Sequence, residues 1–450
     1  MPEPRPSARL IATYQFPVAQ RHGVSDRQRF GLSDITRAGQ DGARATAKYY
    51  SKAGRDERRL VKASFFTGIT GGILWYVLIY YWGSLEFSSA EIGYMGGTGS
   101  AVGVLAYLFG GYLADRLGRK RLFLVGLLST ALGLVLFLSE RNLVVFTVAY
   151  GLTNLGGSLA WPSLMALMST KAPESEMKFF YGVQGFVNQI GLTIATFLGI
   201  FGPPFLSESY GLELLSGYRY VFVGAAICAF VPIIYVVGVT EEKHPHESLM
   251  VKLDRRTTKH LLVYCAQNAM IGAGAALVIP WFPLIFKDGM GASDSWVAMI
   301  ITMSNAVIAI GWFIVPKFAE FRGSVALIVV CQLASVAFMV AIPYSPILIG
   351  VALLYTMRSF LMLVPQPVLN AYIMNIAPER VRASFLGLSQ VSWQLAFAVS
   401  YAIAGNLWAD QYDKVLPFYI GGALYIVASV VFYLYFRNVK DVAVNNSVGG

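Results

Sequence analysis

The sequence is poor in charge and in cysteine. Asp, Glu, Lys and Arg make up only 13% of its 450 residues, whereas 56% are apolar or aromatic. A soluble domain could not bury that much apolar surface, so a soluble protein is excluded. The three cysteines, Cys228, Cys265 and Cys331, all lie in apolar runs, where cysteine behaves as a small hydrophobic residue. We expect no disulfide framework and no cysteine-based metal site.

The sequence also lacks the motifs of enzymes and of cofactor-binding proteins. No glycine-rich loop is followed by Lys and Ser or Thr, so nucleotide hydrolysis is not expected. No nucleophile–base constellation is visible, and we therefore expect neither an enzyme nor a cofactor. His244 and His246 lie close together without further ligands nearby, which favours solvated side chains over a metal site.

The dominant feature is a series of long apolar runs. A bilayer core about 30 Å thick needs about 20 apolar residues per helical span, and backbone polar groups in lipid must be satisfied within the helix. The runs lack the alternation of an outer-membrane barrel. They predict an all-α membrane protein whose twelve transmembrane helices lie at about 63–85, 92–114, 122–139, 143–168, 179–201, 218–239, 261–286, 295–316, 324–342, 346–376, 383–407 and 415–436.

Basic residues gather on one side of this series. The turns after the second, fourth, sixth, eighth and tenth helices hold 4, 2, 5, 2 and 2 Lys or Arg, whereas the opposite turns together hold only Arg141, Arg219, Lys287 and Lys414. Short loops rich in Lys and Arg stay in the cytoplasm. We therefore predict a multi-pass protein of the plasma (cytoplasmic) membrane with both termini in the cytoplasm.

The N-terminal segment is basic and has no apolar pattern. Residues 1–62 hold 13 basic and 6 acidic residues, which supply +7 of the net charge of +10. Gly, Ser, Gln and Arg dominate, so we expect a disordered cytoplasmic tail over 1–60. A segment lying against anionic lipid headgroups is the alternative. Few aromatics are interleaved with the bases, and no nucleic-acid partner is expected.

The chain repeats itself at a shift of 205 residues. The matches fall at equivalent helix ends: Ala114, Asp115 and Gly118 on Ala319, Glu320 and Gly323; Pro162 on Pro367; Ala172, Pro173, Glu174 and Gly182 on Ala377, Pro378, Glu379 and Gly387; and Gln189 on Gln394. This internal duplication predicts two pseudo-symmetric six-helix bundles of like orientation, at 61–239 and 260–437. A cytoplasmic linker loop at 240–259 joins them, and a cytoplasmic tail follows at 438–450.

The turn between the second and third helices carries a family signature. Its pattern of glycine, leucine, small residue, aspartate, base, glycine and two bases is filled by Gly111, Leu113, Ala114, Asp115, Arg116, Gly118, Arg119 and Lys120, with Phe123 after it. With the repeated helices and the linker, the chain resembles the Major Facilitator Superfamily (MFS) over about residues 61–437. The resemblance implies a conformational latch between the halves, formed by Gly111, Asp115, Arg116, Gly118, Arg119 and Lys120, with a weaker copy at Glu320 and Arg322. The alternative is that the bases only set topology.

Polar and aromatic residues inside the spans are the candidates for solute contact. Arg358 lies near mid-membrane, where a guanidinium is costly and marks a functional position, and the resemblance places its helix beside a central cavity. The full set is Arg358, Asn154, Trp161, Tyr76, Tyr80, Gln184, Asn188, Trp281, Gln390 and Gln394. The alternatives are a structural arginine, amides that join helices, and aromatic packing.

These features predict a secondary transporter that moves a small organic solute across the bilayer by alternating access, with efflux of amphipathic compounds as the leading hypothesis. The alternatives are uptake of an organic anion paired with Arg358 and a non-transporting membrane sensor or assembly factor on the same fold. We expect a monomer. No Asp or Glu lies in the middle of a predicted span, so a proton carrier is not visible, and a coupling proton stays open.

Overall fold

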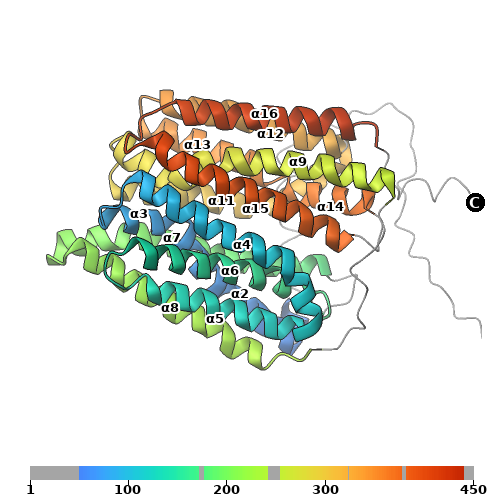
Figure 1. Ribbon diagram of the computed structural model, residues 1–450, viewed down its shortest axis with the longest axis horizontal. Helices are drawn as coiled ribbons and strands as arrows, with labels where there is room; N and C mark the ends of the chain where they lie inside the picture. The colour runs from blue at the N-terminus through green and yellow to red at the C-terminus, as the bar shows by residue number, and fades with distance from the viewer. Residues whose placement is uncertain (1–49, 172–176, 242–253, 323, 378–381, 440–450) are drawn as a thin grey trace, which may run out of the picture.

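The computed structural model describes residues 50–171, 177–241, 254–322, 324–377 and 382–439. Within these ranges all regular secondary structure is helical, which confirms the predicted all-α class. Figure 1 shows long helices lying side by side, with those of the first half (blue to green) on one side and those of the second half (yellow to red) on the other.

The helices of the first half are α2 (Arg55–Gly72), η1 (Ile73–Val77), α3 (Leu78–Ser84), α4 (Ser89–Leu117), α5 (Arg119–Leu136), α6 (Leu143–Met168), α7 (Met177–Tyr210) and α8 (Leu214–Val237). Those of the second half are α9 (Arg255–Val278), η2 (Ile279–Trp281), α10 (Phe282–Leu284), η3 (Ile285–Gly289), α11 (Asp294–Arg322), α12 (Ser324–Ala341), η4 (Ile342–Tyr344), α13 (Leu348–Leu363), α14 (Gln366–Ile376), α15 (Arg382–Trp408) and α16 (Leu416–Phe436).

Nine helical segments in the described ranges are long and apolar enough to cross a bilayer. They are Arg55–Ser84, Ser89–Gly110, Leu143–Met168, Phe180–Tyr210, Leu214–Val237, Arg255–Gly289, Val325–Tyr344, Leu348–Asn370 and Leu416–Phe436. The long helices α5, α11 and α15 pack among them. The chain is thus a multi-pass membrane protein, and the count of twelve spans stays a prediction.

Local capping and proline residues move several helix ends from their predicted places. The first helix begins at Arg55, inside the predicted tail, because the Glu57 carboxylate accepts a hydrogen bond from the Gly54 backbone N–H and caps it. The fifth predicted helix continues through Pro203 to Tyr210. The tenth is divided between α13 and α14 at Pro365, which has no N–H to donate to the helix.

Hydrophobic packing differs between the two ends of the bundle. We call the end with the turns 118–121 and 238–241 the basic end; it lies to the right in Figure 1, around α14. Near the opposite end, one large core contains residues of both halves, among them Tyr81, Trp281 and Trp408. At the basic end each half has a core of its own, one around Phe123 and one around Tyr372. The halves are therefore joined at the opposite end and packed separately at the basic end.

Candidate functional site

Two polar residues join the halves at the opposite end. The Ser89 backbone N–H, at the start of α4, donates to Asp410 Oδ1 at 2.6 Å, and the Asp410 backbone N–H donates to Ser89 Oγ at 2.7 Å. Ala409 and Asp410 have φ of 45° and 57°, a left-handed conformation that is costly for residues other than glycine. This reciprocal pair, which we call the Ser89–Asp410 clasp, holds the end of α15 on the first half.

The helix backbones also touch beside the clasp. A Cβ atom on Gly405 of α15 would lie 2.3 Å from the Ser89 carbonyl oxygen, and a Cβ on Gly93 would lie 2.7 Å from the Gly405 Cα. Only glycine permits this approach. Burial and the nearby carboxylates of Asp410 and Asp288 raise the pKa of Tyr412, so its hydroxyl stays neutral here.

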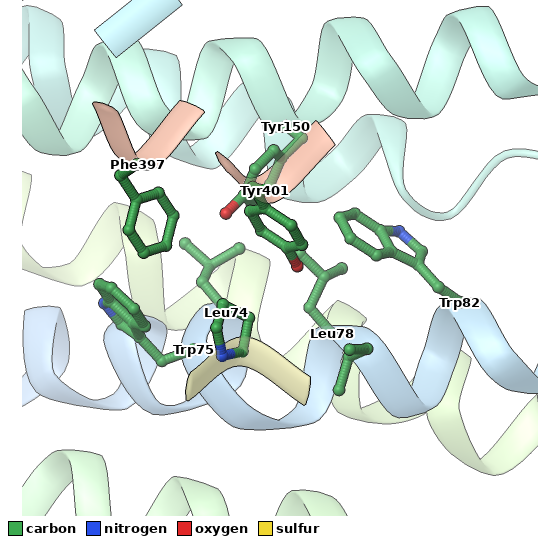
Figure 2. A pocket seen from close by; sticks show the side chains of 9 residues that line it. Leu74, Trp75, Leu78, Trp82, Tyr150, Phe397 and Tyr401 are labelled. Carbon is green, nitrogen blue, oxygen red and sulfur yellow. The ribbon is translucent and has the colours of Figure 1, made fainter. Parts of the chain in front are cut away.

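A small pocket lies between the halves near the opposite end, next to the Ser89–Asp410 clasp. It is lined by Leu74, Trp75, Leu78, Ile79, Trp82, Tyr150, Pro280, Phe397 and Tyr401. Figure 2 shows the aromatic side chains converging from the first half and from α15 of the second, with Trp75 below Phe397. The ring centroids of these two residues are 6.4 Å apart. The open volume is about 20 Å³, which holds a water but no organic solute.

Exposure increases from this pocket toward the basic end. Along the first helix, Trp82 is 1% exposed, whereas Trp75 is 50% exposed. On α6, Asn154 and Trp161 follow Tyr150 by about one and three turns on the same face, and Trp161 is 49% exposed. Trp75 and Trp161 are thus half exposed, whereas Trp82, nearer the opposite end, is buried.

Two of the predicted amide residues lie beside Gly103 of α4. A Cβ on Gly103 would lie 3.2 Å from Gln394 Nε2 and 3.6 Å from the Asn154 Cβ. Gln394 Nε2 donates to the Ser100 carbonyl oxygen across the halves at 3.2 Å, while Asn154 Nδ2 donates to the Tyr150 carbonyl oxygen at 3.0 Å. Gln394 therefore joins the halves. Gln390, about one turn earlier on α15, is exposed.

Arg358 is a buried cation, only 4% exposed. Its Nη2 donates to the Tyr425 hydroxyl at 3.2 Å, and its guanidinium lies 5.9 Å from the centre of the Phe282 ring. The Tyr76 hydroxyl lies near Arg358 and donates to Asn305 Oδ1 at 3.4 Å, so the first half reaches the second half here. Over the part of the chain that the structure describes, Arg358 forms no ion pair, and Arg358 Nε and Asn305 Nδ2 have no hydrogen-bond partner.

The other predicted contact residues lie in packed surroundings. Asn188 Nδ2 donates to the Ser64 carbonyl oxygen at 2.9 Å, which joins α7 to α2. Gln184 is buried on α7. Tyr80 donates to the Pro283 carbonyl oxygen at 3.5 Å, and Trp281 is fully buried with its ring 5.7 Å from that of Tyr401. These contacts fit the alternatives of helix joining and packing, and solute contact by these residues stays a prediction.

Sequence reasoning missed the aromatic residues that line the pocket, namely Trp75, Trp82, Tyr150, Phe397 and Tyr401. A signal was present for two of them, because Trp393, Phe397 and Tyr401 recur every four residues and so share one face of α15. In a chain with 14% aromatic residues, however, such spacing is no guide to a site.

The signature turn has a partner that the sequence did not reveal. Gly118 has φ of 90°, and the Glu241 carboxylate fills the space where its side chain would lie. Glu241 accepts from the backbone N–H groups of Arg119 at 2.6 Å and Lys120 at 3.3 Å and so caps α5. The side chains of these two bases donate to the carbonyl oxygens of Ala166 and Val237, within the same half.

The other residues of the predicted latch do not show whether it joins the two halves. The latch between the halves therefore stays a prediction. Arg116 is exposed. Gly111, Asp115, Glu320 and Arg322 lie on α4 and α11 but outside the residues whose side chains the structure describes.

We expect Glu241→Ala to destabilise the protein by about 0.5 to 2 kcal/mol, the range for loss of a helix N-cap. The backbone N–H groups of Arg119 and Lys120 would lose their acceptor. The measurement is the thermal unfolding midpoint in detergent. Exposed Glu140, at the opposite end, supplies the control Glu140→Ala. An equal midpoint for both variants would show that the cap contributes nothing.

Comparisons with known proteins agree with this architecture. A family model described as Major Facilitator Superfamily matches residues 60–401. The chain is 22% identical over 343 residues to Multidrug resistance protein MdtH of Proteus mirabilis (strain HI4320), covering 74% of this chain and 82% of that protein. It is 23% identical over 358 residues to the uncharacterized MFS-type transporter YqjV of Bacillus subtilis (strain 168), covering 75% and 82%.

Solved structures show the same fold. The crystal structure of nucleoside transporter NupG matches with a TM-score of 0.67 at 12% identity, covering 86% of this chain and 100% of that one. A D-xylose-proton symporter matches with a TM-score of 0.65 at 15% identity, covering 86% and 97%.

Proposed function

Because the chain belongs to the Major Facilitator Superfamily and is therefore a membrane transporter rather than an enzyme, we propose that it exports small amphipathic compounds by alternating access. The observation that carries this proposal is the unequal packing of the two ends, with one core shared by both halves at the opposite end and separate cores at the basic end. Rocking of the halves about a site between them would exchange these two arrangements.

The proposed direction of transport rests on topology and on the pocket. Basic turns stay in the cytoplasm, so we place the basic end, both termini and the 240–259 linker there, in the plasma membrane. The surface around Trp75 then faces the cytoplasm, which is the side where an exporter takes up its solute. Its aromatic lining suits amphipathic compounds. The bundles at 61–239 and 260–437 would move as units in a monomer, without a cofactor.

The test is a panel of solutes added to purified protein. A ligand that binds only the folded state raises the unfolding midpoint by mass action. Compounds that stabilise the protein then enter flux assays in sealed proteoliposomes, with and without a proton gradient, which also tests the coupling proton. We expect amphipathic compounds to stabilise the protein and to be transported. Absence of flux for every stabilising compound would favour the membrane sensor or assembly factor.

Buried Arg358 favours a second candidate, transport of an organic anion. The guanidinium has hydrogen-bonding capacity left at Nε and forms no ion pair within the described ranges, so an anionic group on the solute would supply its missing counter-charge. In this candidate Arg358 and Tyr76 hold the anion between the halves.

We expect Arg358→Lys to reduce transport of a carboxylate solute by about tenfold or more, because lysine keeps the charge but loses the planar fork that binds a carboxylate with two hydrogen bonds. The measurement is initial uptake into proteoliposomes for an anion and for its neutral amide. Arg437→Lys, at the end of α16, is the matched control. Unchanged transport of every tested anion would contradict this candidate.

A further inference from the structure

We infer that the transported solute stacks a flat aromatic group on the exposed face of Trp75, beside the pocket, and carries no positive charge. This inference rests on the proposed function and narrows its substrate class. The ring geometry of the pocket and the placement of charge around it carry the inference.

Aromatic surfaces from both halves meet where the pocket opens. On α15 the Trp393 and Phe397 rings are stacked, with centroids 4.8 Å apart and planes 21° apart. From the first half, the Trp75 indole meets Phe397 edge to face at an interplanar angle of 72°. These rings form two walls at a steep angle, one contributed by each half.

One wall remains free to accept another ring. Trp75 is 50% exposed although it lines the pocket, whereas Phe397 is 4% exposed and already stacked. Aromatic rings prefer offset-stacked or edge-to-face contacts. A flat aromatic group of the solute could therefore stack on the exposed face of Trp75.

The charges around the pocket disfavour a cation. None of the residues that line the pocket is acidic. Among the described acids outside the pocket lining, Asp56 and Glu241 lie at the basic end, and Glu91, Asp288, Asp294 and Asp410 lie at the opposite end. Among the described residues, Arg358 is a buried cation of the second half. A solute cation would lose its hydration without a counter-charge, which costs more than a cation–π contact returns.

The test uses three compounds that share the anthracene ring system. They are anthracene-9-carboxylate, 9-anthracenemethanol and (9-anthracenylmethyl)trimethylammonium. We measure thermal stabilisation of the full chain and flux into proteoliposomes. The carboxylate and the alcohol should bind and be transported, whereas the ammonium compound should bind about tenfold more weakly. Equal or tighter binding of the ammonium compound, or binding of none of the three, would overturn the inference.

Variants test the role of the ring at position 75. Trp75→Ala should weaken binding of the alcohol about five- to tenfold, and Trp75→Phe should retain most of it, because the stacking face is lost only in the first. Phe230→Ala, an exposed aromatic on α8, is the control and should bind normally. Unaltered binding by Trp75→Ala would contradict the stacking role. If Trp75→Ala does not fold, the comparison of the three compounds on the unaltered chain still decides the inference.

The proposed function and this inference fail in different ways. Flux of aliphatic or cationic solutes alone would overturn the aromatic, non-cationic class and leave the transporter in place. Absence of flux for every compound of the wider panel would overturn the export proposal itself.

Discussion

Gly405→Ala is expected to lower solute flux about tenfold or more while the protein still folds. The added methyl carbon would lie 2.3 Å from the Ser89 carbonyl oxygen, a distance that the two backbones cannot accommodate without separating. Overpacking of this kind costs about 1 to 3 kcal/mol, and a penalty confined to one state shifts the population of the two states by about 5- to 150-fold. The arrangement closed at the opposite end would bear that penalty, because α4 and α15 meet at these residues in it.

Two measurements distinguish this effect from simple damage. Flux is compared with that of Gly387→Ala on the same helix, where a Cβ meets nothing within 4 Å. Labelling of a cysteine that replaces the fully buried Ser89 then reports exposure of the opposite end, and we expect it to increase in the Gly405→Ala background. Normal flux together with unchanged labelling would show that the close approach of the two backbones has no role in transport.

Gly156→Ala is expected to have the largest effect on folding. Gly156 of α6 packs directly on α5, and a Cβ there would lie 2.2 Å from Thr130 Oγ1 and 2.5 Å from the Gly126 carbonyl oxygen. Because one of these neighbours is backbone, the helices would have to move apart. We expect a loss of stability of about 1 to 3 kcal/mol and a reduced yield of monodisperse protein.

The neighbouring residue supplies a matched control. A Cβ on Gly157 would meet no neighbouring atom within 4 Å, so Gly157→Ala should leave stability unchanged or raise it slightly, as alanine favours helix. Unfolding midpoints of the two variants in the same detergent give the comparison. Equal midpoints would refute the tight contact between α5 and α6.

The helical fold could be predicted from the sequence because it follows from a simple pattern in the chain. Long apolar runs and the 205-residue repeat indicate the helices and their duplication. Helix ends were less accessible, because they depend on single local contacts. One hydrogen bond from Gly54 to Glu57 moves the first helix start into the predicted tail, and Pro203, expected after the end of its helix, lies inside it.

The candidate site could be predicted only in part. Arg358 could be singled out from the sequence because a charge inside an apolar run is rare, and the structure places it near Tyr76 of the first half. The sequence gives no indication of the hydrogen-bond partners of Asn188 and Gln394, because these partners are backbone carbonyl oxygens. Glu241 likewise follows α8 in a polar segment, and only the folded chain brings it to Gly118.

The central claim is that access alternates between the two ends, and a cross-link at the Ser89–Asp410 clasp tests it most directly. Ser89→Cys and Asp410→Cys are combined in a chain whose Cys228, Cys265 and Cys331 are replaced by alanine, and solute flux is measured in proteoliposomes before oxidation, after it and after reduction. The account predicts that the disulfide stops flux and that reduction restores it, with no effect in the cysteine-free chain. Undiminished flux through fully cross-linked protein would contradict it.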